Sequence, residues 1–345
     1  MSKSMRGEYF SKLSFEHLLS AHDRARENKT NKKSVLVFEM DLESNIINIL
    51  RKLQNNTYEF GEYRIFTIKE PKERIIKALP YIDRVVNQWY VYEFIKPYFV
   101  PRFIKDTYAC IDGRGTHLAV TNLQNYMRRM KRNNDNYYIL KCDVRKFFDN
   151  INKDILYNIL NKHIKDKDLF ILTKKIIYDN EEKVGIPIGN YTSQYFANIY
   201  LNELDQYIKR ILKIKYYVRY MDDFILLLDS KEEAKKTVNI IDYYLHHYLG
   251  LSLNEKSRYY PRRMGVNFCG YRIFETHILL RTNSKQKIKR NIKIWNKAYL
   301  KGELDTNKTK LQFNSWLAHA SHANSYNLQR SVIYKLGFSV EQRNE

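Results

Sequence analysis

The stretch of chain from residue 215 to 229 limits the fold more than any other. It contains two apolar, β-prone runs on either side of two adjacent acids, Asp222 and Asp223, and this pattern predicts a hairpin with both carboxylates at its turn. An isolated Asp-Asp pair is usually a solvated turn, because Asp favours turns in any context. The apolar runs on both sides favour a different interpretation, in which buried strands hold the two carboxylates in place.

A third acid, Asp143, ends another predicted strand, which begins at Tyr137. If the two strands are neighbours in one sheet, three carboxylates converge. Carboxylates held this close repel one another unless a cation lies between them, and Mg²⁺ takes hard oxygen ligands and binds phosphates. The three acids therefore predict a site for two-metal phosphoryl transfer.

Strand and helix patterns alternate irregularly along the rest of the chain, which predicts an α+β fold rather than a regular βαβ array. The alternation of polar and apolar residues in Tyr63–Ile68 predicts a half-buried strand. The other expected elements are an extended or buried segment at 75–79, helices at 83–99, 152–160, 169–177, 192–211 and 231–248, and a second small hairpin at 265–280.

The charge of the chain indicates a polyanionic partner. Its 345 residues include 60 Lys and Arg against 38 Asp and Glu, a formal net charge of +22, which suits nucleic acid or an anionic membrane. The apolar run Phe224–Leu228 is far shorter than the ~20 residues of a spanning helix, and the first 20 residues lack an apolar signal segment. Three widely spaced cysteines form no zinc-binding pair. We therefore expect a cytoplasmic protein that binds nucleic acid and no membrane.

Residues 281–301 contain no acid and carry many basic side chains. Ile288, Ile292, Trp295 and Tyr299 have the spacing of one helix face. Lysines recur every four residues on another face, at Lys285, Lys289, Lys293 and Lys297. A run of charges is ordinarily a solvated helix, but the missing acids favour a helix that binds the phosphates of nucleic acid.

The motifs and their order resemble those of bacterial reverse transcriptases. Tyr220–Asp223 resembles the catalytic box, Asp143–Asp149 resembles motif A, and Gly185–Asn198 resembles motif B. The other similar segments are Leu253–Lys256 (motif D), Gly265–Tyr271 (the primer-grip hairpin, motif E), and Pro71–Arg74 and Leu79–Arg84 (finger motifs).

The resemblance implies a right-hand polymerase fold. The N-terminal extension and fingers would occupy residues 1–135, the palm residues 136–275, with motif B shared between palm and fingers, and a basic helical thumb residues 276–345. It also implies an RNA-directed DNA polymerase that uses two Mg²⁺ ions, for which Mn²⁺ can substitute.

By the same resemblance, Asp143, Asp222 and Asp223 are catalytic and bind the metals together with Val144. The implied dNTP-binding residues are Lys72, Arg74, Arg84, Phe148, Ile188, Gly189, Gln194, Met221 and Lys256. The implied nucleic-acid-binding residues are Tyr220, Gly270 and Tyr271, joined by Lys285, Lys289, Lys293 and Lys297.

Several of these roles have plainer alternatives. Phe148 would be the steric gate that favours dNTPs over NTPs, although it can equally be a core residue. Lys256 would donate a proton to pyrophosphate, and the basic finger residues would hold the triphosphate and template. Each of these cations can instead be an ordinary surface charge.

Motif B reads Ile188-Gly-Asn-Tyr-Thr-Ser-Gln194, with Ile where most relatives have Gln and Gln where they have Pro. This is the pattern of diversity-generating retroelement enzymes. A second segment, Thr107–His117, also resembles a segment of that group. Without an amide at residue 188, discrimination between bases is expected to loosen, and the resemblance implies error-prone copying at template adenines. Two alternatives stay open: a defence-associated bacterial reverse transcriptase, and a non-catalytic nucleic-acid-binding homologue.

The partners that the resemblance implies are a template RNA, a primer strand, the cDNA product and dNTPs. A dedicated non-coding RNA and a small basic accessory protein belong to the same expectation, in a bacterial or phage-encoded system.

Overall fold

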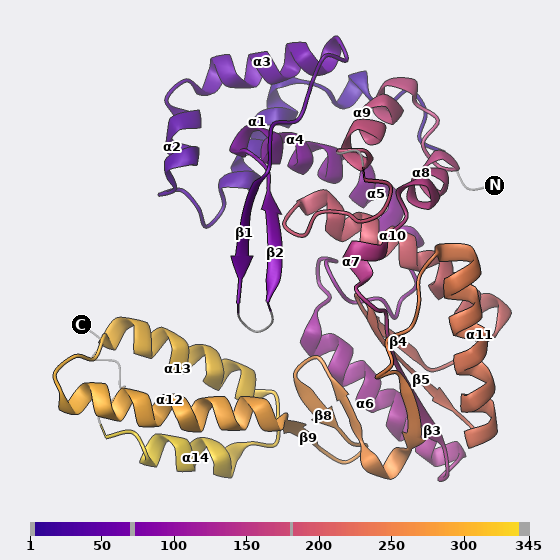
Figure 1. Cartoon of the computed structure of the whole chain (residues 1–345), viewed down its shortest axis with the longest axis vertical. Coiled ribbons are helices and arrows are strands. Elements are labelled where there is room, and N and C mark those ends of the chain that lie inside the picture. Colours follow the sequence, from indigo (N-terminus) through magenta and orange to yellow (C-terminus); the bar gives the residue numbers. More distant parts are fainter. Residues whose placement is uncertain (1–3, 70–72, 180–181, 338–345) are drawn as a thin grey trace.

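The computed structural model describes residues 4–69, 73–179 and 182–337. Figure 1 shows a helical lobe with a projecting hairpin, a lobe built on a sheet, and a bundle of helices beside that sheet. The hairpin points from the helical lobe into the space between the other two parts.

The helical lobe is built from apolar helix faces that meet in one core. Its helices are α1 (Phe15–Arg26), α2 (Lys33–Glu39), α3 (Leu42–Gln54), α4 (Tyr81–Tyr90), α5 (Lys96–Phe99), α8 (Lys153–Asn161) and α9 (Lys167–Ile177). Shorter turns are η1 (Phe10–Lys12), η2 (Val91–Ile95, a π-helical turn) and η3 (Val100–Arg102). The helices predicted at 83–99, 152–160 and 169–177 are confirmed.

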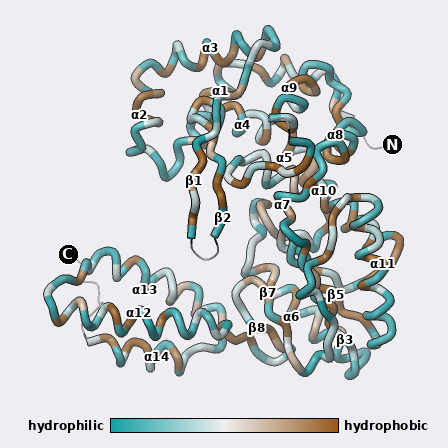
Figure 2. Tube along the Cα trace, in the orientation of Figure 1, coloured by the Kyte–Doolittle hydropathy of each residue, from teal (hydrophilic) through white to brown (hydrophobic). Residues whose placement is uncertain are grey.

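The projecting hairpin pairs β1 (Arg64–Ile68) with β2 (Arg74–Ala78) in an antiparallel sheet of two strands. Both strands carry apolar residues (Figure 2), but every residue of β1 is exposed. The predicted strand is therefore present, whereas the prediction that it is half-buried is wrong. The alternation of β1 has no second layer of structure beneath it, because the hairpin extends away from its lobe.

The palm sheet contains the predicted catalytic hairpin. Its antiparallel strands lie in the order β4 (Tyr217–Tyr220), β5 (Asp223–Leu228), β3 (Tyr138–Asp143) and β6 (Arg258–Pro261). Helix α6 (Thr116–Asn133) packs on one face of the sheet, and α11 (Lys231–Leu249) packs on the other. Both faces of β5 are therefore buried, and the sheet is a rigid support for whatever lies at its end.

Other elements connect the palm to its surroundings. They are α7 (Phe147–Asn150), α10 (Tyr191–Gln206) with its π-helical extension η4 (Tyr207–Ile211), η5 (Arg262–Met264), and a small sheet of β7 (Val266–Phe268), β8 (Tyr271–Ile273) and β9 (Ile278–Leu280). The second hairpin expected at 265–280 is confirmed, with a third strand.

The helical bundle at the C-terminal side has a core of its own. It contains α12 (Thr282–Leu300), α13 (Thr306–Ser321) and α14 (Tyr326–Tyr334), which bury Ile288, Ile292, Trp295, Phe313 and Val332. The side chain of Tyr299 is 48% exposed. Its predicted place on the apolar face is wrong, because the buried cluster on α12 ends one turn earlier.

Within the described residues, no helix combines the length and apolarity that crossing a membrane requires.

Candidate active site

The register of the palm sheet brings the predicted acids together. Asp143 on β3 lies directly opposite Asp223 on β5, and cross-strand neighbours have Cβ atoms about 5 Å apart. Asp222 lies in the hairpin turn, directly before Asp223 at the start of β5. The carbonyl of Asp222 accepts a hydrogen bond of 3.2 Å from the N–H of Val144. Both the strand pairing and this backbone bond thus bring the catalytic box against motif A.

The carboxyl group of Asp223 lies in an unusual electrostatic environment. Burial raises its pKa to about 6, Lys141 opposes that rise, and Asp143 and Asp222 add to it. The Nζ atom of Lys141 is 2.8 Å from Oδ2 of Asp223. The other oxygen, Oδ1, is buried without a hydrogen-bond partner. One oxygen of this carboxylate is therefore compensated and the other is not.

The chemistry of this site fits a divalent cation. Carboxylate oxygens are the ligands that Mg²⁺ prefers, and a buried oxygen without a partner, beside two further acids, is an open coordination position. Across the parts of the chain that the structure describes, however, no three His, Cys, Asp or Glu side chains form a ready-made metal cluster. The three carboxylates thus suit the ion, while Lys141 forms an ion pair with one oxygen of Asp223.

Motif D lies directly on the backbone of motif A. The N–H of Asn254 donates to the carbonyl of Asp143 at 2.7 Å, and the N–H of Asp143 donates to Oγ of Ser257 at 3.1 Å. Lys256 lies in this turn, with its side chain exposed. The turn therefore supports the backbone of Asp143. Lys256 lies between Asn254 and Ser257, the two residues of the turn that make these bonds.

The loop of motif B packs against the helix that follows motif A. The N–H of Ile186 donates to the carbonyl of Phe148 at 2.9 Å. The ring of Phe148 is half-buried and meets Phe147 edge to face, with 5.5 Å between centroids. Part of its ring thus packs in the core and part faces solvent, and its role as a steric gate stays a prediction.

The same loop also binds the finger hairpin. The N–H of Lys77 on β2 donates to the carbonyl of Ile188 at 3.0 Å. Gly189 has φ = +129°, and a Cβ there would lie 2.8 Å from the carbonyl oxygen of Lys77. Glycine is therefore required at residue 189, because any side chain would force the loop and the hairpin apart. Gln194 lies exposed on the first turn of α10.

The predicted basic finger residues occupy different places. Lys72 lies outside the described residues. Arg74 is exposed at the outer end of β2, opposite Ile68. Arg84 is exposed on α4, and its Nε donates to the carbonyl of Leu79 at 2.8 Å. Arg74 thus lies at the start of β2, and Arg84 lies on the helix that follows this strand.

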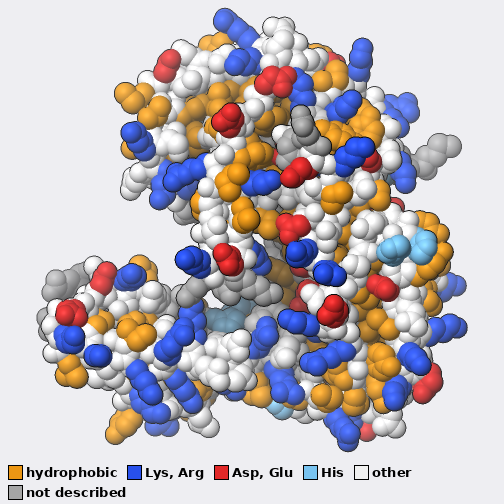
Figure 3. Space-filling model, in the orientation of Figure 1, with side chains coloured by type: hydrophobic (Ala, Val, Ile, Leu, Met, Phe, Trp, Pro, Cys, Tyr) orange, Lys and Arg blue, Asp and Glu red, His pale blue; other side chains and the backbone are white. Residues whose placement is uncertain are grey.

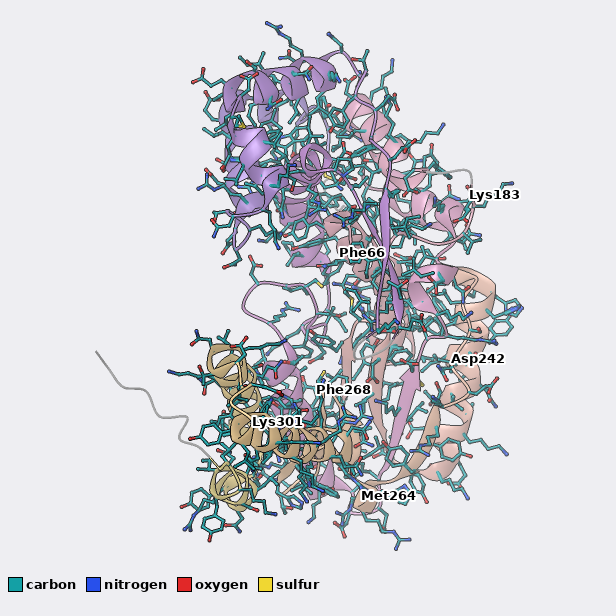
Figure 4. All side chains as sticks on the ribbon, turned by 60° about the vertical axis from the view of Figure 1, so that its left-hand side comes forward. Phe66, Lys183, Asp242, Met264, Phe268 and Lys301 are labelled. Carbon is teal, nitrogen blue, oxygen red and sulfur yellow. The ribbon has the colours of Figure 1, made fainter. Side chains whose placement is uncertain are left out.

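The hairpin of motif E joins the palm to the helical bundle. Tyr271 is fully buried, and its hydroxyl contacts Nδ1 and the carbonyl oxygen of His319, each at 2.9 Å. A Cβ at Gly270 would lie 3.0 Å from the ring of His319. Figure 4 places Phe268 of this hairpin between the palm strands and the bundle. Tyr271 therefore packs two parts of the molecule together, which does not support the prediction that its side chain contacts nucleic acid.

A family model described as reverse transcriptase (RNA-dependent DNA polymerase) matches residues 68–273. The chain belongs to the reverse transcriptase family. It is 24% identical, over 277 aligned residues, to the putative COX1/OXI3 intron 2 protein of Saccharomyces cerevisiae, covering 61% of this chain and 30% of that protein. It is 26% identical, over 159 residues, to an uncharacterized 91 kDa protein in a cob intron of Schizosaccharomyces pombe, covering 44% of this chain and 18% of that protein. The chain thus spans less than a third of either relative.

The fold agrees with that membership. The solved structure of apo telomerase from Candida tropicalis matches with a TM-score of 0.50 and 12% identity, over 81% of this chain and 59% of that one. At this identity the likeness concerns the fold alone. The expected α+β right-hand fold, with fingers, palm and thumb, is confirmed.

The thumb surface of this reverse transcriptase is basic on more than one side. Of the predicted lysine ladder, Lys289, Lys293 and Lys297 are exposed, while Lys285 is half-buried and lines a hollow beside α14. A second groove, of about 890 Å³, lies between α12 and α13 and is lined by Lys287 and Arg290. Figure 3 shows basic side chains on the thumb and around the hollow beneath the finger hairpin.

Sequence reasoning missed several residues at this site. Lys141 could have been found, because residues two apart on a strand share a face and Asp143 follows it by two. Ser257, Lys287 and His319 carried no comparable signal, since their importance depends on which distant segment packs against them.

Proposed function

We propose that this chain synthesises DNA on an RNA template. The 3′-hydroxyl oxygen of a primer bonds to the α-phosphorus of a dNTP, pyrophosphate leaves, and the hydroxyl proton is released. The observation that carries the proposal is the pairing of Asp143 with Asp223 across two buried strands, with Asp222 adjacent in the turn.

Asp143, Asp222 and Asp223, together with Val144, would hold two divalent ions, Mg²⁺ or in its place Mn²⁺. Bound there, the ions would lower the pKa of the primer hydroxyl and offset the charge of the triphosphate. The ion pair between Lys141 and Asp223 would keep that carboxylate oriented when no metal is bound.

Primer extension tests this assignment. On poly(rA)/oligo(dT) and on a heteropolymeric RNA, Asp222→Asn and Asp223→Asn should each lower dNTP incorporation by at least about 10³-fold, because each removes a metal ligand. Glu232→Gln, an exposed acid on α11, is the matched control and should retain activity. Equal incorporation by wild type and the Asp variants would remove these carboxylates from the chemistry. Tight RNA binding with no incorporation by wild type would instead support the non-catalytic alternative.

We propose that Phe148 excludes the ribose 2′-hydroxyl from the nucleotide site. Phe148→Ala should raise ribonucleotide incorporation markedly, and Phe147→Ala, at the buried ring beside it, controls for loss of packing. Unchanged selectivity between dNTPs and NTPs in Phe148→Ala would remove Phe148 from this role.

We propose further that the enzyme copies adenines inaccurately, as in a diversity-generating retroelement. The side chain of Ile188 is apolar and half-buried, so it offers no hydrogen bond to an incoming base. Ile188→Gln should lower misincorporation opposite template adenine, and an identical error spectrum would contradict the proposal.

The biological setting that we propose is the cytoplasm of a bacterium or a phage-infected cell. A dedicated non-coding RNA would be the template, and a small basic accessory protein would assist. Sequencing the RNA and cDNA that copurify with the protein separates two roles: products that match a variable gene favour diversification, and products without such a target favour antiviral defence.

The nucleic acid would lie between the fingers and the thumb. Tyr220, Gly270 and the lysine ladder would contact it, and Lys72, Arg74, Arg84, Gly189, Gln194, Met221 and Lys256 would surround the dNTP. The division at residues 135 and 275 is part of this proposal, although α6 precedes residue 135 and packs on the palm sheet.

A further inference from the structure

A buried ion pair lies on the face of the palm sheet that points away from the catalytic carboxylates. Tyr220 is directly opposite Asp223 in the sheet, so Arg219, one residue earlier on β4, faces the other way. Arg219 and Asp205 on α10 are both fully buried. Two guanidinium nitrogens lie 2.8 and 2.6 Å from the two carboxylate oxygens.

The guanidinium group makes more contacts than this pair. Its Nη2 also donates to Oγ1 of Thr107 at 3.4 Å, and its Nη1 donates to Oδ1 of Asn198 at 3.0 Å and to the carbonyl of Met221 at 3.1 Å. With the two bonds to Asp205, all five N–H donors of the group have an acceptor. A buried charge is tolerated under these conditions, and losing one partner of such a set is costly.

One of the five acceptors belongs to the catalytic turn. Met221 has φ = +54°, a left-handed conformation that side chains other than glycine adopt rarely and that surrounding contacts must maintain. The carbonyl that Arg219 binds is part of the peptide group that leads into Asp222. The guanidinium group thus binds the peptide group between Met221, with its strained backbone, and Asp222.

Three other acceptor atoms belong to the helix of motif B. Asn198 and Asp205 both lie on α10, which begins at Tyr191, directly after the loop that contains Gly189. The same side chain of Arg219 therefore binds the catalytic turn and this helix. The amide of Asn198 in turn donates to the carbonyl of Ala109 at 2.8 Å, so a third segment is fixed as well.

We propose that Arg219 is a positioning residue, which fixes the catalytic turn relative to helix α10 and its loop. The proposal deepens the polymerase function proposed above and rests on it. Arg219 is fully buried, on the face of the sheet that points away from Asp143 and Asp223. Its effect on the reaction passes through the carbonyl of Met221 and the position of Asp222.

Arg219→Lys keeps the positive charge but cannot reproduce the planar, five-donor geometry of the guanidinium. A double variant, Arg219→Met with Asp205→Leu, replaces the pair with apolar side chains, a change that buried ion pairs often tolerate. Tyr217→Phe is the matched control. Tyr217 is equally buried and its hydroxyl donates to the same Asp205 at 2.6 Å, but no contact of that hydroxyl reaches Met221.

Two measurements separate positioning from general packing. In primer extension, both Arg219 variants should lower kcat by about 10- to 100-fold, the size of effect that a small misplacement of reacting groups produces. They should also raise the Mg²⁺ concentration needed for half-maximal rate several-fold, with the KM for dNTP changed much less. The second measurement is NMR of methionine methyl groups labelled with ¹³C, of which the chain has seven. The signal of Met221, assigned from its loss in Met221→Leu, should shift or broaden in both Arg219 variants and stay in place in Tyr217→Phe.

An unshifted Met221 signal in folded Arg219 variants overturns the proposal. So does the same shift in Tyr217→Phe, since that would show a general effect of packing. If wild type extends no primer with any metal, the polymerase function fails, and the Met221 signal alone still decides whether Arg219 holds the turn.

Discussion

The two hairpins of this protein both carry apolar side chains and have opposite environments. The catalytic hairpin, β4–β5, is almost completely buried, whereas in the finger hairpin, β1–β2, all of β1 is exposed. Phe66 lies on the exposed hairpin (Figure 4) and is 43% exposed, while Phe224 is fully buried. The exposure of Ile65, Phe66 and Ile68 shows that apolar side chains on a strand do not by themselves make it part of a rigid core.

The two environments suit two tasks. In the proposed function, the carboxylates would hold metal ions and need fixed positions, which β5 would supply through packing on both faces. The finger hairpin would lie over an incoming nucleotide and need freedom to move, and β1 is exposed along its whole length. One contact that joins it to motif B is the backbone bond between Lys77 and Ile188.

The largest expected difference between the hairpins is in stability. Ile225 is fully buried and Ile65 is 62% exposed. Ile225→Ala should lower the free energy of unfolding by about 2–5 kcal/mol, because it leaves a cavity in the core. Ile65→Ala should change it by less than about 0.5 kcal/mol. Urea denaturation measures the free energy of unfolding of both variants. Equal losses of free energy would mean that the finger hairpin is as firmly packed as the palm.

A second prediction concerns pH and tests the burial of the catalytic hairpin. Since burial raises the pKa of Asp223 from 3.8 to about 6, the folded protein binds more protons than the unfolded chain between these values. The contribution of Asp223 to stability in EDTA should therefore fall as pH rises through this window, by at most about 3 kcal/mol.

Asp223→Asn removes this titration. The difference in unfolding free energy between wild type and Asp223→Asn, measured at intervals from pH 4 to 7, should decrease with rising pH. A difference independent of pH would show that Asp223 titrates as an exposed carboxyl group does.

The smallest expected effect concerns the tie between the finger hairpin and motif B. Gly189→Ala places a methyl group 2.8 Å from the carbonyl oxygen of Lys77, and should cost about 1–2 kcal/mol through this overlap. Gly302→Ala is the matched control, because Gly302 also has a positive φ but no atom within 4 Å of its added Cβ.

Both glycine variants place alanine at a positive φ, but φ = +129° at Gly189 is less favourable for alanine than φ = +70° at Gly302. Their difference therefore reports the contact together with this extra backbone cost. Activity should fall in Gly189→Ala only, measured as primer extension at saturating dNTP. Equal losses in the two variants would mean that the loop and the hairpin separate without consequence.

The sequence predicted many elements of the palm and of the helical lobe, but not all of them. The catalytic hairpin, its helices and the small sheet of motif E follow from local patterns that the structure keeps. Helix α6 was missed although Ala119, Leu123, Met127 and Met130 recur at helical spacing and are buried. The exposure of β1 could not be read from its residues, because a strand's alternation does not reveal whether another layer covers it.

The candidate site divides in the same way. Asp143, Asp222 and Asp223 could be recognised as candidate metal ligands, because the chemistry of metal binding restricts the residue types. The roles of Ser257 and Arg219 could not be assigned, since each acts on a residue distant in the sequence or on a backbone atom. Every residue has a backbone carbonyl group, so a side chain that binds one does not restrict which residue type carries it.

The thumb encloses an apolar core of its own around Trp295 and Phe313, and it meets the palm at β9 and at the contact of His319 with Tyr271. A bundle that keeps itself folded can tilt as one body without unfolding. In the proposed polymerase, the product duplex would lengthen by one base pair at each cycle and would have to advance by the same step. A thumb of this construction would be able to release and regain its hold on the duplex without disturbing the palm.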